Sequence, residues 1–444
     1  MTRARPLAGW GRHPVRDCTL AAPETEAEAA ALVAAGPVIA RGNGRAYGDS
    51  ALGVPATLST RRMNRMRAFD PATGVLEAEA GVLLADIIDT FLPRGWFPAV
   101  TPGTKFVTLG GMIAADVHGK NHHRDGAMGE TVLWLDLLCP DGRVVRCGPG
   151  QERALFEWTV GGMGLTGVIL RAAIRLRPVE TGWIRQVTRP ARDLSRAIAL
   201  FEENAEATYS VAWIDCLATG AAQGRSIVML GEHARRDQLP DDRVARPFRT
   251  RARRRLSVPF DLPGWLLNRY SARAFNAAYW NAGLRGAGVR LVDWDSYFYP
   301  LDSILGWNRV YGRRGFAQFQ CVLPLDAAET GLQRLLNEIA RAGQGAFLGV
   351  LKRMGAEARR FSFPMPGYTL ALDFPATPGL PGLLARMDDI VQEHGGRFYL
   401  AKDSHLTAET LRRTDPRSAA FARMRSETGA AGRLVSAQSE RLSL

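Results

Sequence analysis

Cysteine and histidine are both scarce in this chain of 444 residues. Its 5 cysteines stand far apart, without a Cys-x-x-Cys pair, and their odd number fits reduced thiols better than a disulfide framework. Its 7 histidines gather only in HGKNHH at 118–123, which lacks both the His-Glu-x-x-His spacing of zinc enzymes and a nearby pair of cysteines. We therefore expect neither disulfide bonds nor a metal site.

Long apolar runs are missing as well. The longest stretches, such as SIVML at 226–230, fall far short of the roughly 18 consecutive apolar residues that a membrane-spanning helix needs. No apolar stretch follows the charged N-terminal residues MTRARPLAGWGRHP, so they do not resemble a secretory signal. The sequence predicts no transmembrane helix and, by default, a cytoplasmic location.

Acidic residues are outnumbered, with 44 Asp and Glu against 57 Lys and Arg and a formal net charge of +13. Arginine supplies much of the excess in DDRVARPFRTRARRR at 241–255. Such a run is either a solvated surface loop or a contact for anionic lipid headgroups, to which each basic residue contributes about 1 kcal/mol. No helix-turn-helix, zinc or RNA-recognition pattern accompanies it, so we expect no nucleic-acid partner.

Glycine is plentiful, and it clusters at 38–50, 101–123 and 159–169. The first cluster, VIARGNGRAYGDS, has the spacing of neither a dinucleotide fingerprint nor a P-loop, because its third glycine comes one residue late and no Gly-Lys-Ser/Thr follows. Each cluster is either an ordinary turn or a place where backbone N–H groups approach an anion or a planar ring closely. Together the three clusters favour a large phosphate-bearing cofactor across the N-terminal half.

Helices and strands alternate in the first half, as in the helix expected at 24–36 and the strand at 38–41 that enters the first glycine cluster. Beyond about residue 180 strands predominate, with helices between or after them. The strands expected there are 315–324, 346–355 and 367–375, and the helices are 327–343 and 382–396. The pattern predicts an α+β chain whose second domain carries an antiparallel sheet.

Polar residues recur on one face of the strand expected at 315–324. Period-two geometry places Gln318 and Gln320 together, opposite Phe319 and Cys321. Such a face either points to solvent or lines a polar substrate site.

The order of the glycine clusters resembles the FAD-binding module of the vanillyl-alcohol oxidase and p-cresol methylhydroxylase superfamily. Within it, HGKNHH at 118–123 and YLAKDS at 399–404 point to the decaprenylphosphoryl-β-D-ribose 2-oxidase family. The likeness runs in order from GWGR at 9–12 to the final SERL.

This resemblance implies a two-domain, vanillyl-alcohol-oxidase-like α+β flavoprotein. Residues 1–180 would form the first part of the FAD-binding domain and residues 181–396 the substrate-binding domain. Residues 397–444 would return to the FAD-binding domain.

The resemblance also implies FAD as the cofactor. Covalently flavinylated relatives often carry histidine where this chain has Arg45, so we expect the flavin to be held without a covalent bond. The implied flavin contacts are Arg41, Gly42, Asn43, Gly44, Arg45, Ala46, Tyr47, Gly48, Gly103, Thr108, Gly110, Gly111, His118, Ile169 and Tyr399.

The implied reaction is oxidation of the ribose C2 hydroxyl of a polyprenyl-phosphate ribose to the 2-keto sugar, by hydride transfer to the flavin N5. It is the first half of an epimerisation that makes the arabinose donor for cell-wall arabinan. Lys402 matches a family lysine that acts as base or as orienting donor, with His118 and Tyr47 completing the expected catalytic set. The implied substrate contacts are Gln320, Lys352, Lys402 and Tyr299. At Ala371 the mycobacterial type has a cysteine.

The implied partners are a separate NAD(P)H-dependent short-chain reductase, which completes the epimerisation, and the inner face of the plasma membrane, met peripherally by the basic loop 243–255. Two other functions stay open. One is an FAD-dependent oxidase or dehydrogenase of soluble alditols or sugar lactones, which would show no dependence on lipid. The other is a flavin-containing scaffold or lipid-binding subunit whose catalysis has been lost, which an inactive parent protein in a comparison with a Lys402→Ala variant would favour.

Overall fold

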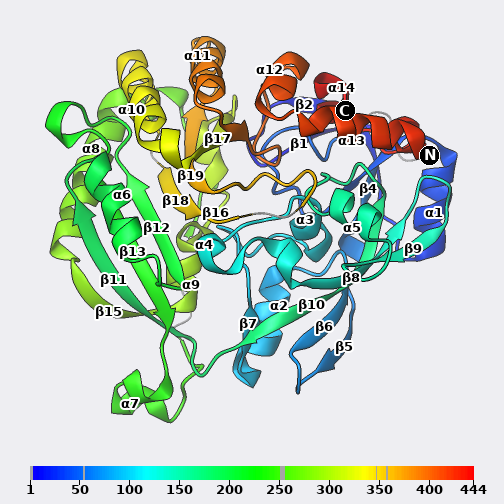
Figure 1. Ribbon diagram of the computed structural model, residues 1–444, viewed down its shortest axis with the longest axis horizontal. Helices are drawn as coiled ribbons and strands as arrows, with labels where there is room; N and C mark the ends of the chain where they lie inside the picture. The colour runs from blue at the N-terminus through cyan, green and yellow to red at the C-terminus, as the bar shows by residue number, and fades with distance from the viewer. Residues whose placement is uncertain (1–3, 54–55, 251–255, 347, 357–358) are drawn as a thin grey trace.

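Two groups of β-sheets stand side by side, one from each half of the chain (Figure 1). The computed structural model describes residues 4–53, 56–250, 256–346, 348–356 and 359–444. The basic loop expected at 243–255 is therefore described only as far as Thr250, and 251–255 lie outside the described residues. The mixed architecture with antiparallel sheets confirms the α+β class.

A four-stranded and a six-stranded sheet make up the first half. Their strand orders are β1-β2-β4-β3 and β5-β6-β10-β8-β9, with β7 added beside β10. Helix α1 (Glu26–Ala35) begins where the Thr25 side chain accepts a hydrogen bond from the Glu28 N–H, and it ends before Gly36, within the helix expected at 24–36. The strands are β1 Arg5–Ala8, β2 Val15–Ala21, β3 Val38–Arg41, β4 Ala56–Ser59, β5 Met66–Asp70, β6 Val75–Glu79, β7 Trp96–Pro98, β8 Val132–Leu138, β9 Val144–Cys147 and β10 Val168–Pro178, and the helices α2 Leu84–Phe91, α3 Leu109–Ala114, α4 His122–Asp125 and α5 Arg153–Thr159.

An eight-stranded antiparallel sheet dominates the second half, in the order β15-β11-β13-β12-β18-β19-β17-β20. The strands expected at 315–324, 346–355 and 367–375 are its members β17, β18 and β19. Its strands are β11 Trp183–Ala191, β12 Tyr209–Ile214, β13 Ser226–His233, β15 Gly288–Asp293, β17 Phe316–Pro324, β18 Gly349–Met354, β19 Gly367–Pro375 and β20 Arg397–Phe398. The short pieces around it are α7 Asp241–Val244, β14 Leu256–Ser257, α9 Trp294–Phe298 and β16 Ile304–Leu305.

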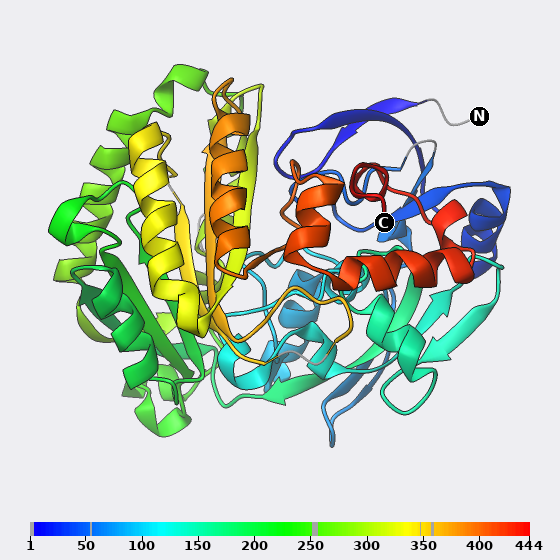
Figure 2. The same cartoon turned by 45° about the horizontal axis from the view of Figure 1, so that its top comes forward.

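Helices α6 (Leu194–Glu203), α10 (Leu325–Ala342) and α11 (Leu380–Glu393) cover one face of this sheet (Figure 2). Strand β17 presents Phe319 and Cys321 to the resulting core. Its other face carries Gln318 and Gln320, which are only 6% and 5% exposed. The alternative that these glutamines point to solvent is therefore wrong, and they face the interior between the two halves.

Helix α8 (Arg269–Arg285) packs on the same face of the sheet as the two glutamines. The ring of Tyr279 lies 4.6 Å from that of Trp213, and Gly283 approaches Ile227, whose Cδ1 would lie 2.3 Å from an added Cβ. Trp213 and Ile227 are paired across β12 and β13, and their neighbours Ala212 and Val228 point to the opposite core. The sequence pattern did not reveal this helix.

The last helices, α12 (Ala408–Thr414), α13 (Arg417–Glu427) and α14 (Ala437–Leu442), return to the first half, so that both termini lie on the same side of the molecule (Figures 1 and 2). The Val38 N–H donates to Arg433 O at 2.8 Å, and the Ala437 N–H donates to Leu52 O at 2.8 Å. The eight-stranded sheet extends through Phe398, just past the domain boundary expected at 396. Among the helices of the described ranges, none has the length and apolarity needed to cross a bilayer.

Candidate active site

A cavity of about 280 Å³ lies where the glycine-rich loops meet the face of the eight-stranded sheet that carries Gln318 and Gln320. Its walls come from the loop after β3, the segment leading into and through α3, strands β17 to β19 and the segment after β20. Of the residues expected to bind cofactor or substrate, the structure brings these together around the cavity: Gly42, Asn43, Gly44, Arg45, Ala46, Tyr47, Gly103, Thr108, Gly111, His118, Gln320, Lys352, Tyr399 and Lys402. Ala371 lines it as well.

The first two glycine-rich loops interlock at the cavity wall. Thr108 caps α3 by accepting a hydrogen bond from the Gly111 N–H, and a Cβ at Gly42 would lie 2.1 Å from the same Thr108 Oγ1. The Asn43 side chain donates to Phe106 O at 2.7 Å, and Gly44 adopts a φ of +64°, which side-chain-bearing residues rarely take. Glycine at these positions thus allows the first glycine-rich loop to contact the second closely.

Three other residues of the expected cofactor set lie behind the wall. Arg41 turns beneath the loop, where its guanidinium donates to Ala8 O at 2.7 Å and to Ala51 O at 3.3 Å. Gly48 lies against the chain at Asp403, whose carbonyl oxygen would be 1.9 Å from an added Cβ. Gly110 allows α3 to approach Ala80, whose Cβ would lie only 2.7 Å from an added Cβ. These residues shape the cavity from outside.

Ile169 and Tyr299 also lie outside the cavity lining. Ile169 is buried in the core of the six-stranded sheet. Tyr299 is fully buried, with its ring 6.0 Å from that of Trp294 and 5.8 Å from the Lys105 ammonium. Its neighbours Leu301 and Asp302 reach the cavity instead.

Lysine is rare in this chain, and all four lysines lie at or near the cavity. Lys352 and Lys402 line it, while Lys120 donates to Tyr297 O and Lys105 pairs with Asp295. Burial lowers the pKa of Lys352 to about 8, and burial together with the charge of Lys352 lowers the pKa of Lys120 to about 7. The sequence reasoning missed Lys120, although a count of lysines would have singled it out beside the other three.

Lys402 faces a buried carboxylate. Its ammonium lies 3.8 Å from the centre of the Tyr47 ring. Burial lowers the pKa of Lys402 to about 7, a shift that the charge of Asp373 opposes and that of Lys352 increases. Burial raises the pKa of Asp373 to about 7, against the opposing hydrogen bond from Gln318 and the charge of Lys402. The pKa values of Lys402 and Asp373 thus both lie near neutral pH, the range in which a side chain can serve as an acid or a base.

Among the described residues, only one of the two carboxylate oxygens of Asp373 has a hydrogen-bond partner. Its Oδ1 accepts a hydrogen bond from the Gln318 side chain, which register places directly opposite on β17. Its Oδ2 is buried without a hydrogen-bond partner among the residues that the structure describes. Sequence reasoning also missed Asp373, although period-two alternation on β19 puts it on the same face as Ala371.

His118 presents a hydrogen-bond donor in the cavity wall. Its Nε2 lies 3.1 Å from the Gln320 amide nitrogen, which can only donate, so Nε2 accepts and Nδ1 carries the proton. Burial, with the charges of Lys352, His122 and Lys402, lowers the pKa of His118, which keeps the ring neutral. Within the described ranges Nδ1–H has no partner, and the His118 ring lies 5.0 Å from Tyr399.

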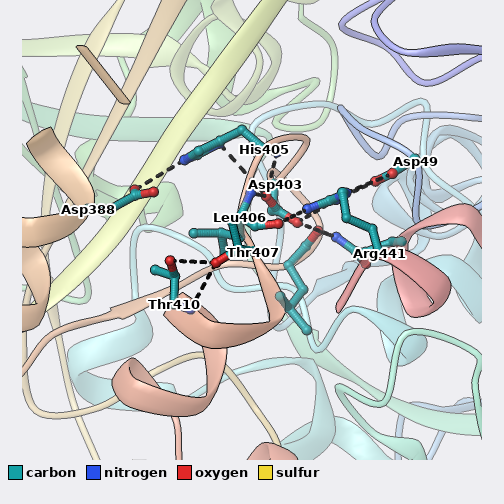
Figure 3. A network of polar contacts seen from close by, with 10 residues as sticks. Asp49, Asp388, Asp403, His405, Leu406, Thr407, Thr410 and Arg441 are labelled. Carbon is teal, nitrogen blue, oxygen red and sulfur yellow. Dashed lines mark hydrogen bonds and ion pairs between the residues drawn. The ribbon is translucent and has the colours of Figure 1, made fainter. Parts of the chain in front are cut away.

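A polar network fixes the segment that carries Lys402 (Figure 3). Arg441, from α14, donates to Asp49 Oδ1 at 2.7 Å and to Asp403 Oδ2 at 2.8 Å. His405 Nε2 lies 3.1 Å from Asp388 on α11. Arg441 thereby ties the first glycine-rich loop to the residue that follows Lys402.

Arg441→Met is expected to lower the free energy of unfolding by about 3–5 kcal/mol, because it leaves two buried carboxylates without their cation. Asp49 and Asp403 are only 3% and 2% exposed. Denaturant unfolding of the holoprotein measures the effect. Arg413→Met is the control: its partner Glu409 is exposed on the same helix, so that variant should lose less than about 1 kcal/mol. Equal losses in both variants would contradict the role of the network.

Residues 19–148 match the FAD binding domain family, a range that contains the first two glycine-rich loops. Over its whole length the chain is 36% identical to decaprenylphosphoryl-β-D-ribose oxidase from Mycolicibacterium smegmatis, in an alignment that covers 98% of that protein. The chain belongs to the decaprenylphosphoryl-β-D-ribose oxidase family. An uncharacterized protein of Streptomyces coelicolor is 35% identical over 74% of this chain and 91% of its own length. Cytokinin dehydrogenase 9 of Oryza sativa matches at 32% over 33% of this chain and 29% of its own length.

A member of this family is an FAD-dependent oxidoreductase, and the chemistry of the residues that line the cavity suits this cofactor. Gly103 faces open space, with no heavy atom near the position of an added Cβ, so its backbone can approach a bound ring or phosphate. The Arg45 guanidinium, stacked 3.9 Å from the centre of the Trp10 ring, supplies positive charge at the lining. The His118 Nδ1–H, which has no partner among the described residues, offers a donor for a flavin acceptor atom.

Proposed function

We propose that this protein oxidises the ribose C2 hydroxyl of a polyprenyl-phosphate ribose to the 2-keto sugar, with FAD bound without a covalent link. The observation that carries the proposal is the position of Lys402, which lies over the ring of Tyr47 in the cavity wall. The charge of the buried Asp373 acts on this lysine, and the chain is similar over its whole length to decaprenylphosphoryl-β-D-ribose oxidase. When bound, FAD supplies the acceptor for the C2 hydride.

Lys402 acts as the base in this proposal. Its neutral Nζ takes the proton of the ribose hydroxyl, and the buried carboxylate of Asp373 stabilises the ammonium that forms. Tyr47 packs against Lys402 and limits the directions in which the amine can point. The neutral ring of His118 completes the catalytic set as a hydrogen-bond donor through Nδ1.

Gln320 and Lys352 bind the sugar hydroxyls and the phosphate. Lys352 reaches the cavity from β18 and forms no hydrogen bond or ion pair with any residue of the described ranges, so its charge is available to a phosphate. Lys120, which interacts electrostatically with Lys352, adds to the attraction for the phosphate. We leave Tyr299 out of the contact set because it is buried behind the cavity wall.

The first two glycine-rich loops hold the flavin and its pyrophosphate in a vanillyl-alcohol-oxidase-like arrangement. The flavin contacts come from residues 42–47, Gly103, Thr108 and Gly111 in these loops and from Tyr399 after β20. Behind them lie Arg41, Gly48, Gly110 and the core residue Ile169. Arg45 cannot form the covalent flavin bond that a histidine can.

A second enzyme is needed to complete an epimerisation. Oxidation leaves a carbonyl at C2, which an NAD(P)H-dependent short-chain reductase can reduce from the opposite face to give the arabinose donor for cell-wall polysaccharide. The substrate's prenyl chain lies in a membrane, so we place the reaction at the cytoplasmic face of the plasma membrane.

Asp373→Asn and Lys352→Met are expected to move the pH dependence of kcat/KM in opposite directions. Asp373 faces Lys402 from β19 and raises its pKa, whereas Lys352 on β18 lowers it. Since the neutral amine is the active base, the acidic limb should shift by about one unit to lower pH in Asp373→Asn and to higher pH in Lys352→Met. His118, whose lowered pKa keeps it neutral, adds no charge here.

Turnover with a dye acceptor between pH 5 and 9 gives this profile, with Asp326→Asn, on the exposed first turn of α10, as the control. Shifts in the same direction for both variants would exclude Lys402 as the titrating base.

The product identifies the reaction. Incubation with polyprenyl-phosphoryl ribose should give a lipid that has lost a pair of hydrogens and that borohydride reduces to a mixture of the ribose and arabinose forms. A soluble alditol, incubated in parallel, should remain unchanged. Oxidation of the alditol with the lipid left intact would contradict the proposed substrate.

A further inference from the structure

The strongly exposed aromatic side chains of the described residues all stand in one segment. Trp265 is 73% exposed and Phe260 64%, and the others lie on α8. We call this set the aromatic surface: Phe260, Trp265, Tyr270, Phe275 and Tyr279. Single exposed apolar residues are common on proteins, but a group of this kind marks an interaction site.

One end of the aromatic surface borders the cavity through the strand pair β14 and β16. Leu256 and Ser257 of β14 pair in parallel with Ile304 and Leu305 of β16. Asp302 and Trp307, on either side of β16, both line the cavity. The segment that carries Phe260 and Trp265 therefore leaves from the rim of the site.

The other end borders the cavity through the sheet. The ring of Tyr279 packs against that of Trp213. Trp213 is the strand partner of Val350 between β12 and β18, and Val350 is the strand partner of Ala371 between β18 and β19. Val350 and Ala371 line the cavity. An apolar row thus runs from the exposed ring of Tyr279 to the site.

The charge around the aromatic surface is positive. Residues 256–290 include four arginines and a single acidic residue, Asp261, which is paired with Arg12. A hollow beside Phe260 is lined by Arg12, Arg309 and Arg313 as well as Asp261. Aromatic rings favour the interface between lipid headgroups and acyl chains, and arginine pairs with phosphate.

We infer that the aromatic surface docks onto an anionic lipid bilayer. The three most exposed rings, those of Phe260, Trp265 and Tyr270, enter the headgroup region, while Arg269, Arg273, Arg285 and Arg290 meet the lipid phosphates. Docking needs no substrate. The further step rests on the proposed function: a prenyl-linked sugar passes from the bilayer to the cavity along Tyr279 and Trp213.

Vesicle flotation of the holoprotein tests the docking. Vesicles of phosphatidylglycerol and phosphatidylcholine should bind the protein, less so as salt rises, and vesicles of phosphatidylcholine alone should bind it more weakly. Phe260→Ser/Trp265→Ser should lower the partition coefficient about tenfold or more. Val144→Ser/Leu325→Ser, at exposed apolar positions on β9 and α10, is the matched control and should bind as the parent does.

Absence of binding to the anionic vesicles, or equal binding by the Phe260→Ser/Trp265→Ser variant, would overturn the inference. A parent dimer in gel filtration that this variant abolishes would assign the surface to a second copy of the chain instead. Turnover of detergent-dispersed substrate separates the two proposals, because the variant should keep it. If the parent protein binds vesicles but does not oxidise this substrate, the proposed function is contradicted and the inferred docking is not.

Discussion

Lys402→Met is expected to lower kcat by about 10²–10⁴-fold while FAD stays bound. The substitution removes the group that takes the hydroxyl proton, and it leaves the glycine-rich loops in place. Methionine fills most of the same space beside Tyr47, so the fold should be retained. Steady-state turnover, with flavin content and thermal unfolding measured on the same sample, gives the result.

Lys402→Arg distinguishes a base from an orienting donor. Arginine keeps a positive donor but does not give up its proton in proteins. If Lys402 is the base, this variant should be as inactive as Lys402→Met. Substantial turnover by Lys402→Arg would show that a donor suffices, and more than about a tenth of the parent rate in Lys402→Met would remove Lys402 from the chemistry.

Gly42→Ala is expected to cost the protein most of its flavin. The new Cβ would lie 2.1 Å from Thr108 Oγ1, and Thr108 cannot turn away without giving up the cap of α3. The first glycine-rich loop or the start of the helix must therefore move. Overpacking of this kind costs about 1–3 kcal/mol, which corresponds to about a tenfold to hundredfold loss of FAD affinity.

FAD titration of the apoprotein measures this affinity, and circular dichroism shows whether the variant has folded. Gly150→Ala is the control, since no heavy atom lies within 4 Å of an added Cβ there and its φ is not positive. Native affinity in Gly42→Ala would mean that the contact between the two loops does not form part of the cofactor site.

The sequence predicted the strands and the glycine-rich loops well, because both leave local signals. Alternation on β17 put Gln318 and Gln320 on one face, and the glycine spacing located the cavity wall. A local sequence pattern does not predict which residue lies opposite on the neighbouring strand of a sheet. The role of Asp373 depends on its register opposite Gln318, which is set by strands 55 residues apart.

Residues of one glycine-rich loop also have different structural roles, which the motif alone does not distinguish. Gly42 and Gly48 stand in the same loop, yet Gly42 lines the cavity and Gly48 packs against Asp403. Arg41 is directed away from the cavity by two backbone carbonyls that only the folded chain supplies. Helix α8 escaped notice because its buried face is made of small and polar residues, such as Ala272 and Asn276, rather than a row of large apolar ones.

The most direct test of the proposed function is anaerobic visible absorbance of the purified holoprotein during titration with a polyprenyl-phosphoryl ribose, with a soluble alditol in a parallel sample. The lipid-linked sugar alone should bleach the flavin band. Bleaching by the alditol alone would assign the protein to the oxidation of soluble polyols, and a protein without a flavin spectrum would contradict the account as a whole.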